Sequence, residues 1–184
     1  MRIIAGKAKG HQIKAPRGTA TRPATDLVRG AVFSILETMV SDWSLVLDLF
    51  SGSGALGIEA LSRGASWVDF VDHNPRCCDI IRQNLEKTKL LAQAHVYCCT
   101  VAKAISFLDK EYNIIIIDPP YSNSSIGGLV ANLATSKLVG ANSTVVITHS
   151  PRLQLNSIYA PLNLVKERRH GDTYISVYQM EDKP

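Results

Sequence analysis

Four consecutive isoleucines, Ile114–Ile117, constrain the fold of this chain more than any other segment. Because the side chains of a strand alternate between its two faces, an unbroken run of β-branched apolar residues predicts a strand that is buried on both faces. Such strands belong to parallel sheets that are covered by helices on both sides. The segment Asp118–Tyr121 follows directly, so it is expected at the carboxyl end of a buried strand, where open α/β sheets bind their ligands.

The residue types in Asp118-Pro119-Pro120-Tyr121 suit a planar base that carries an exocyclic amine. The Asp118 carboxylate accepts hydrogen bonds, and the two prolines remove N–H donors, so the local carbonyl groups are the polar groups that the backbone offers. Tyr121 supplies a flat face for stacking. We therefore take Asp118, Pro119 and Tyr121 as candidate catalytic residues. A solvated turn after a core strand is the alternative interpretation.

Segments typical of strands and of helices alternate along the chain, which predicts an α/β fold with a mostly parallel sheet. Residues 162–169 and 173–180 flank a short Gly-containing turn and predict an antiparallel hairpin at the C-terminal end. A parallel sheet closed by such a hairpin is typical of a Rossmann-like methyltransferase and differs from the dinucleotide-binding sheet, whose sixth strand is also parallel. Strands are expected at residues 45–50, 67–72, 95–98, 113–117 and 143–148, with helices beginning near Ala55, Pro75, Val101 and Ser125.

The chain of 184 residues is expected to form one main domain with a short extension. Residues 1–24 are predicted to be a basic hairpin and linker, and residues 25–184 the methyltransferase domain, whose first helix begins near Thr25 or Asp26. No segment has the apolar length of a membrane helix, and the first residues lack the apolar core of a signal peptide, so we expect a cytoplasmic protein. The four cysteines lack the spacing of a zinc site, which predicts reduced thiols and no metal.

Positive charge is concentrated at the N-terminus. Residues 1–29 contain seven basic residues and one acidic residue, a charge of +6, whereas the whole chain carries only +4. Contacts to phosphates dominate sequence-independent affinity for nucleic acids, so this asymmetry predicts a polyanion-binding extension; a solubilising arm is the alternative. The candidate RNA-binding residues are Arg2, Lys7, Lys9, Arg17, Arg22 and Arg29.

Residues 52–57 read Gly-Ser-Gly-Ala-Leu-Gly and match the pattern G-x-G-x-x-G between a predicted strand and a predicted helix. The pattern alone fits a nicotinamide dinucleotide. Asp48, at the end of the preceding strand, would however repel a pyrophosphate at the helix N-terminus. S-adenosylmethionine suits the site better, because its sulfonium and ammonium groups are positive and its ribose hydroxyls can donate to Asp72, at the end of the next strand.

Three segments together resemble the RsmD family, the bacterial methyltransferases that act on guanine N2 in small-subunit ribosomal RNA: residues 1–29, residues 48–60 and Asp118–Tyr121. Many amino-group methyltransferases share the last two segments, so residues 1–29 carry the narrower resemblance. The resemblance implies S-adenosylmethionine as the cofactor and methylation of one guanine amine in 16S rRNA, within an assembling small subunit. We expect the enzyme to act as a monomer.

The resemblance also implies roles for single residues. Asp48, Gly52 and Gly54 would hold the methionine part of the cofactor, and Asp72 its ribose. Many relatives carry an acid near the adenine where this chain has Cys99-Thr100-Val101, so adenine recognition is assigned to backbone groups and Thr100. The candidate cofactor-binding residues are Asp48, Ser51, Gly52, Gly54, Asp72, His73, Thr100 and Val101.

Acceptance of the amine hydrogens by the Asp118 carboxylate and the Pro119 carbonyl would free the lone pair of the amine nitrogen. Whether Asp118 takes the proton or only orients the amine is left open. Two other functions fit the same residues. One is methylation of adenine N6 in DNA, or of a glutamine in a protein, because these substrates present a similar amine. The other is a non-catalytic RNA-binding assembly factor, against which the intact acids Asp48, Asp72 and Asp118 argue.

Overall fold

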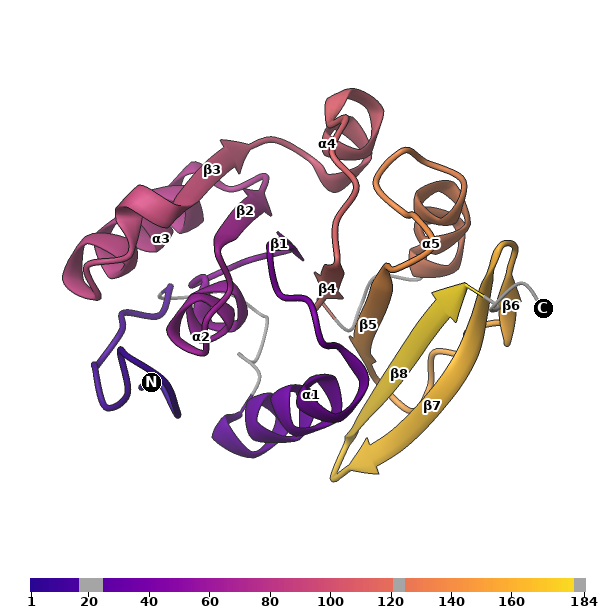
Figure 1. Ribbon diagram of the computed structural model, residues 1–184, viewed down its shortest axis with the longest axis horizontal. Helices are drawn as coiled ribbons and strands as arrows, with labels where there is room; N and C mark the ends of the chain where they lie inside the picture. The colour runs from indigo at the N-terminus through magenta and orange to yellow at the C-terminus, as the bar shows by residue number, and fades with distance from the viewer. Residues whose placement is uncertain (17–24, 121–124, 181–184) are drawn as a thin grey trace.

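The structure is a computed structural model that describes residues 1–16, 25–120 and 125–180. Within these ranges eight strands form one sheet (Figure 1). The strands are β1 (Leu45–Leu49), β2 (Trp67–Asp72), β3 (Ala94–Cys98), β4 (Ile114–Ile117), β5 (Thr144–His149), β6 (Ile158–Tyr159), β7 (Leu162–His170) and β8 (Thr173–Met180). Their order is β3-β2-β1-β4-β5-β8-β7-β6, with β1 to β5 parallel and β8 antiparallel to β5.

This topology confirms the predicted parallel sheet closed by a C-terminal hairpin, and the fold is Rossmann-like. The five predicted parallel strands agree with β1 to β5 to within one residue at each end. The two-residue strand β6, which pairs with the start of β7, was not predicted. A strand this short shows no alternation of apolar and polar residues, so the sequence carries no pattern that reveals it.

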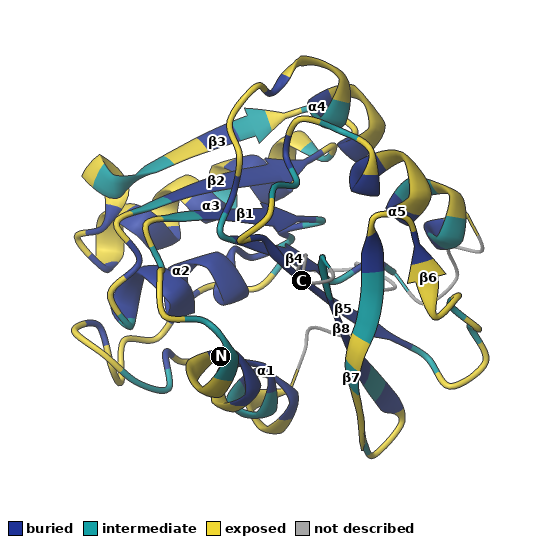
Figure 2. Cartoon of the chain, turned by 45° about the vertical axis from the view of Figure 1, so that its right-hand side comes forward, coloured by how far each residue is buried: buried dark blue, intermediate teal, exposed yellow. Residues whose placement is uncertain are grey.

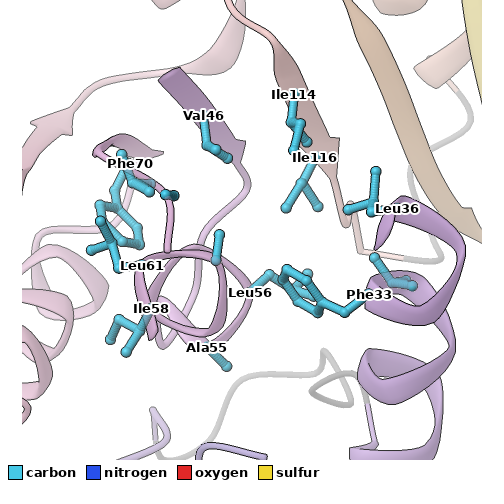
Figure 3. Packing of buried hydrophobic residues seen from close by; sticks show 14 of the residues in the cluster. Phe33, Leu36, Val46, Ala55, Leu56, Ile58, Leu61, Phe70, Ile114 and Ile116 are labelled. Atoms are coloured by element: carbon cyan, nitrogen blue, oxygen red, sulfur yellow. The ribbon is translucent and has the colours of Figure 1, made fainter. Parts of the chain in front are cut away.

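Helices cover both faces of the sheet. They are α1 (Asp26–Met39), α2 (Ala55–Ser62), α3 (Pro75–Lys87), α4 (Val101–Phe107) and α5 (Ile126–Ala134), with a 3-10 turn at Leu91–Gln93. Helices α1, α2 and α3 pack in one core layer, and α4 and α5 in the other. Consecutive strand residues divide between these layers, since Val46 packs with the first layer and Leu47 with the second. Figure 3 shows the first layer, in which Phe33 of α1 extends toward Leu56 of α2.

Side-chain caps begin three of these helices where the sequence predicted them. The hydroxyl of Thr25 accepts a hydrogen bond from the Val28 N–H, and the side chain of Asn74 accepts one from the Arg76 N–H. The hydroxyl of Thr100 accepts from the Lys103 N–H at 3.2 Å. Each cap satisfies a backbone donor that the first turn of a helix leaves free.

The N-terminal residues form the predicted hairpin and dock on α2 and α3. Arg2 bridges Gln12 in antiparallel fashion, and Ile3, Ala8 and Ile13 are buried in the same core layer as α1 to α3. The buried carboxylate of Glu59, on α2, accepts from the N–H groups of Ile4 and Ala5 at 2.8 and 2.9 Å. The boundary predicted at residue 24 lies outside the described residues and stays a prediction.

One side chain of α3 joins this hairpin to the glycine loop. The Asn84 side-chain amide donates to the carbonyl groups of Lys14 and Ser53, both at 2.9 Å, and its oxygen accepts from the Lys14 N–H at 2.8 Å. Asn84 is 1% exposed. These bonds satisfy both amide hydrogens of Asn84 and fix the glycine loop and the hairpin to one helix.

All four cysteines are free thiols, and both cysteines of α3 are buried. Among the described ranges, no helix combines the length and the apolar character needed to cross a membrane.

Candidate active site

Three carboxylates gather at the carboxyl ends of adjacent strands. Asp48 is the penultimate residue of β1, Asp72 ends β2, and Asp118 follows β4. Because β2 and β4 flank β1, the three acids lie side by side. The residue two positions before each acid belongs to the core layer formed with α1 and α2. Because side chains of a strand alternate between its faces, all three acids lie on that face of the sheet. The carboxyl ends of β1 and β4 are also where the strand order reverses, the place at which open α/β sheets bind ligands.

Asp48 is the most deeply buried of these acids, at 1% exposure. Its Oδ2 atom accepts from the Gly57 N–H at 2.9 Å, whereas its Oδ1 atom has no hydrogen-bond partner among the described residues. Burial raises the pKa of Asp48 to about 8, and the charges of Asp118 and Asp72 add to the effect. A buried carboxylate oxygen without a partner is costly, so this site favours a ligand that is positively charged or donates hydrogen bonds.

The glycine loop turns from β1 into α2 through left-handed backbone conformations. Gly52 and Gly54 have φ angles of +55° and +77°, which glycine adopts without steric cost. Phe50 also has a positive φ, of 59°. The Ser51 hydroxyl donates to the Asp48 carbonyl at 2.6 Å and accepts from the Val71 N–H at 3.0 Å. Ser51, predicted to contact the cofactor, therefore uses its hydroxyl to hold β1 and β2 together.

Asp72 receives two backbone hydrogen bonds. Its Oδ2 accepts from the Gly52 N–H and its Oδ1 from the Asn74 N–H, each at 2.8 Å. Each carboxylate oxygen has a further lone pair, so Asp72 can still accept from ribose hydroxyls. The neighbouring His73 side chain is 73% exposed and lies 3.9 Å from Asp72 Oδ1. Both residues remain candidates for the cofactor site.

The last two cofactor-binding candidates, Thr100 and Val101, lie beyond β3. The Thr100 hydroxyl caps α4, as described above, and Val101 is buried as the first residue of that helix. The Cys99 N–H donates to the Asp72 carbonyl at 3.0 Å, so the segment that precedes Thr100 is tied to the end of β2. The assignment of adenine to this segment stays a prediction.

Asp118 is positioned by a residue that the sequence did not reveal. The Thr148 hydroxyl, at the carboxyl end of β5, donates to Asp118 Oδ1. Burial raises the pKa of Asp118 to about 6, and the hydrogen bond from Thr148 acts in the opposite direction. Pro119 is buried, while Tyr121 lies outside the described residues. Thr148 could be found only from the sheet register, in which Ile117 pairs with Ile147 and the next residues therefore meet.

The basic residues assigned to RNA binding differ in exposure. Arg2, Lys7 and Lys9 are exposed on the hairpin, and Arg17 and Arg22 lie outside the described residues. The structure corrects the assignment of Arg29. Its side chain is fully buried, and its guanidinium donates to the Arg2 carbonyl at 2.6 Å and to Asp26 at 3.0 Å. In this position Arg29 links α1 to the hairpin and lies out of reach of RNA phosphates.

The sheet order, the glycine loop and the acids at the strand ends define the fold of the class I S-adenosylmethionine-dependent methyltransferases. A family model described as "Conserved hypothetical protein 95" matches residues 1–179. The chain belongs to this family, and its resemblance to RsmD proteins is confirmed.

Named relatives match almost the whole chain. "Putative rRNA methyltransferase YlbH" of Bacillus subtilis is 32% identical over 97% of this chain and 98% of its own length. "Ribosomal RNA small subunit methyltransferase D" of Escherichia coli is 29% identical over 98% of this chain and 90% of its own length. Among solved structures, "Putative methyltransferase yhhF from Escherichia coli" superimposes with a TM-score of 0.83, at 26% identity, over 100% of this chain and 99% of that one.

Proposed function

We propose that this protein uses S-adenosylmethionine to methylate the exocyclic N2 amine of a guanine in 16S rRNA, as a monomer, on an assembling small subunit in the cytoplasm. The observation that carries the proposal is the Asp118 carboxylate, held by Thr148 beside the buried Asp48 at the carboxyl end of the sheet. The choice of small-subunit rRNA is supported by the name of the Escherichia coli relative.

The residues present fit the cofactor. The Oδ1 atom of Asp48 is buried without a partner among the described residues, which suits a ligand with positive groups. Gly52 and Gly54 adopt left-handed conformations and carry no side chain, so the backbone of the loop can approach a ligand closely. Asp72 would accept from the ribose hydroxyls. When bound, S-adenosylmethionine supplies a methyl group whose transfer to an amine nitrogen leaves S-adenosylhomocysteine and requires the loss of one amine proton.

Asp118 would bind the amine of the target base. Thr148 donates to Oδ1, which leaves Oδ2 of the carboxylate to accept an amine hydrogen. The Pro119 carbonyl is the proposed second acceptor, and Tyr121 the proposed stacking platform for a base taken out of its helix. Two acceptors on one amine orient its nitrogen lone pair. Such positioning of two reactants can supply roughly 7 to 11 kcal/mol of the barrier reduction.

The test is methyl transfer from labelled S-adenosylmethionine to naked 16S rRNA, small-subunit particles and DNA in parallel. We expect label in rRNA, recovered after digestion as N2-methylguanosine. Label in adenine of DNA would support the rival enzyme, and RNA binding without any transfer would support the assembly factor; either result would overturn the proposal.

Asp118→Ala provides the matched variant for this test. Because it removes the amine acceptor and leaves the glycine loop, we expect transfer to be lost while cofactor affinity, measured by calorimetry, stays within about twofold of the wild-type value. Retained turnover in this variant would refute the role of Asp118 in the reaction.

A further inference from the structure

A row of paired residues leads from the site to the C-terminal hairpin. The row begins at Asp118, whose carboxylate is bound by Thr148 of β5. Thr148 pairs with Ile175 of β8, and Ile175 pairs with Arg168 of β7. Side chains of directly paired residues project from the same face of a sheet, so Arg168 lies on the face that carries the site acids. Ile175 is buried in the core layer, whereas Arg168 is exposed.

The register also gives the distance along the sheet. Strands β5 and β8 lie between β4 and β7. Neighbouring strands are about 4.8 Å apart, so the backbone of Arg168 lies about 14 Å from that of Asp118. This span is too long for Arg168 to contact a base bound at Asp118, and it leaves room for neighbouring nucleotides between the two residues. Figure 1 shows β7 at the outer side of the hairpin, and the colours of Figure 2 show exposed residues toward the hairpin tip.

The two faces of β7 carry different charge. Lys166 and Arg168 are separated by one residue, so both project from the site face, and Lys166 pairs there with Val177. The acid between them, Glu167, lies on the opposite face, where it accepts from the Ser176 hydroxyl at 2.9 Å. Arg169 shares that opposite face. The site face of β7 therefore presents two cations and no acid between them.

The guanidinium of Arg168 is available for a ligand. Its Nη1 atom donates to the backbone carbonyl of Glu167 at 3.1 Å, and no carboxylate of the described residues lies within ion-pair distance. We propose that Arg168, assisted by Lys166, binds phosphate groups of the rRNA strand next to the target nucleotide. This inference rests on the proposed function. It adds a second RNA contact, on the opposite side of the site from the basic N-terminal hairpin, so that the target strand is held on both sides.

The test compares Arg168→Ala with Arg169→Ala, because the two variants have the same net charge and alter neighbouring residues on opposite faces. Steady-state methylation of small-subunit particles is measured at several salt concentrations. For Arg168→Ala we expect a KM for the particles about tenfold higher and an unchanged kcat. The slope of log(1/KM) against log salt concentration should be smaller in magnitude by about 0.7 to 0.9. For Arg169→Ala we expect values within about twofold of wild type.

An unchanged KM and salt slope in Arg168→Ala would overturn the inference, as would an equal loss in Arg169→Ala, which would show an effect of net charge alone. Arg168→Lys, which keeps the charge, should retain the salt slope, and thermal unfolding of each variant verifies the fold. If the wild-type protein methylates no RNA, the proposed function itself fails. If the wild-type protein methylates RNA and Arg168→Ala has the same KM and salt slope, only the proposed role of Arg168 fails.

Discussion

The hydrogen bond from the Thr148 hydroxyl predicts the pH range in which Asp118 can fill its proposed role. An ionised carboxylate accepts an amine hydrogen more strongly than the neutral acid does, and burial raises the pKa of Asp118 to about 6. Transfer should therefore be full above pH 7 and fall as the pH drops through 6, where the carboxyl group gains a proton. Thr148→Val removes the hydrogen bond that lowers this pKa, so the acidic limb of kcat/KM for RNA should move to higher pH. An acidic limb at the same pH in both proteins would contradict this role of Thr148.

The raised pKa of Asp48 predicts that cofactor binding is coupled to the loss of a proton. With a pKa raised to about 8, the buried carboxyl group is mostly protonated at pH 7 in the free protein. A cation bound beside it favours the charged form, so cofactor binding at pH 7 should release about one proton. Calorimetry in buffers of different ionisation enthalpy measures this release. The release should vanish in Asp48→Asn, and equal heats in all buffers for the wild type would exclude it.

At the scale of elements, α2 packs closely against β2 because residue 57 is a glycine. A Cβ atom on Gly57 would lie 2.3 Å from the Phe70 ring and 3.0 Å from Asp48 Oδ2. Gly57→Ala should therefore destabilise the protein by about 1–3 kcal/mol in urea unfolding, because the core is overpacked. Gly128, in α5, has open space around it and is the control. Gly128→Ala should be neutral or stabilising, by up to about 1 kcal/mol; equal effects of the two changes would exclude close packing as the cause.

Docking of the N-terminal hairpin depends on one carboxylate of α2, that of Glu59. Glu59 is fully buried and receives two N–H groups of the hairpin as well as the guanidinium of Arg63. Glu59→Ala leaves these donors unpaired, at a cost of about 1–3 kcal/mol for each buried group. Amide hydrogen exchange in residues 3–13 should accelerate strongly. Glu37→Ala, which removes a half-exposed acid that also binds Arg63, is the control and should leave this exchange nearly unchanged.

For the whole molecule, the sequence predicted those features that local patterns encode. The isoleucine run located β4 and its neighbouring acid, and Thr25 and Asn74 marked helix starts because capping is a local interaction. It did not predict contacts that depend on register between distant strands. Thr148 meets Asp118 only because β5 pairs with β4, and no property of residue 148 alone indicates this.

Arg29 is a residue whose predicted role was wrong because the fold buries it. The charge of an arginine is visible in the sequence, whereas its burial depends on how α1 packs against the hairpin. A count of positive charge therefore overestimates the RNA-binding surface by at least this residue. The exposed positions Lys7 and Lys9 keep their predicted role as candidates.

The Asn84 bridge between the hairpin and the glycine loop bears on any attempt to separate the two ends of the protein. A chain shortened by residues 1–16 would lose more than cations, since the amide of Asn84 would face Ser53 alone and the apolar surface under Ile3 would be open to water. Loss of RNA methylation in such a chain would then report damage to the glycine loop as well as loss of RNA contacts. Exchange of Lys7 and Lys9 for glutamine, which spares the bridge, keeps the two causes apart.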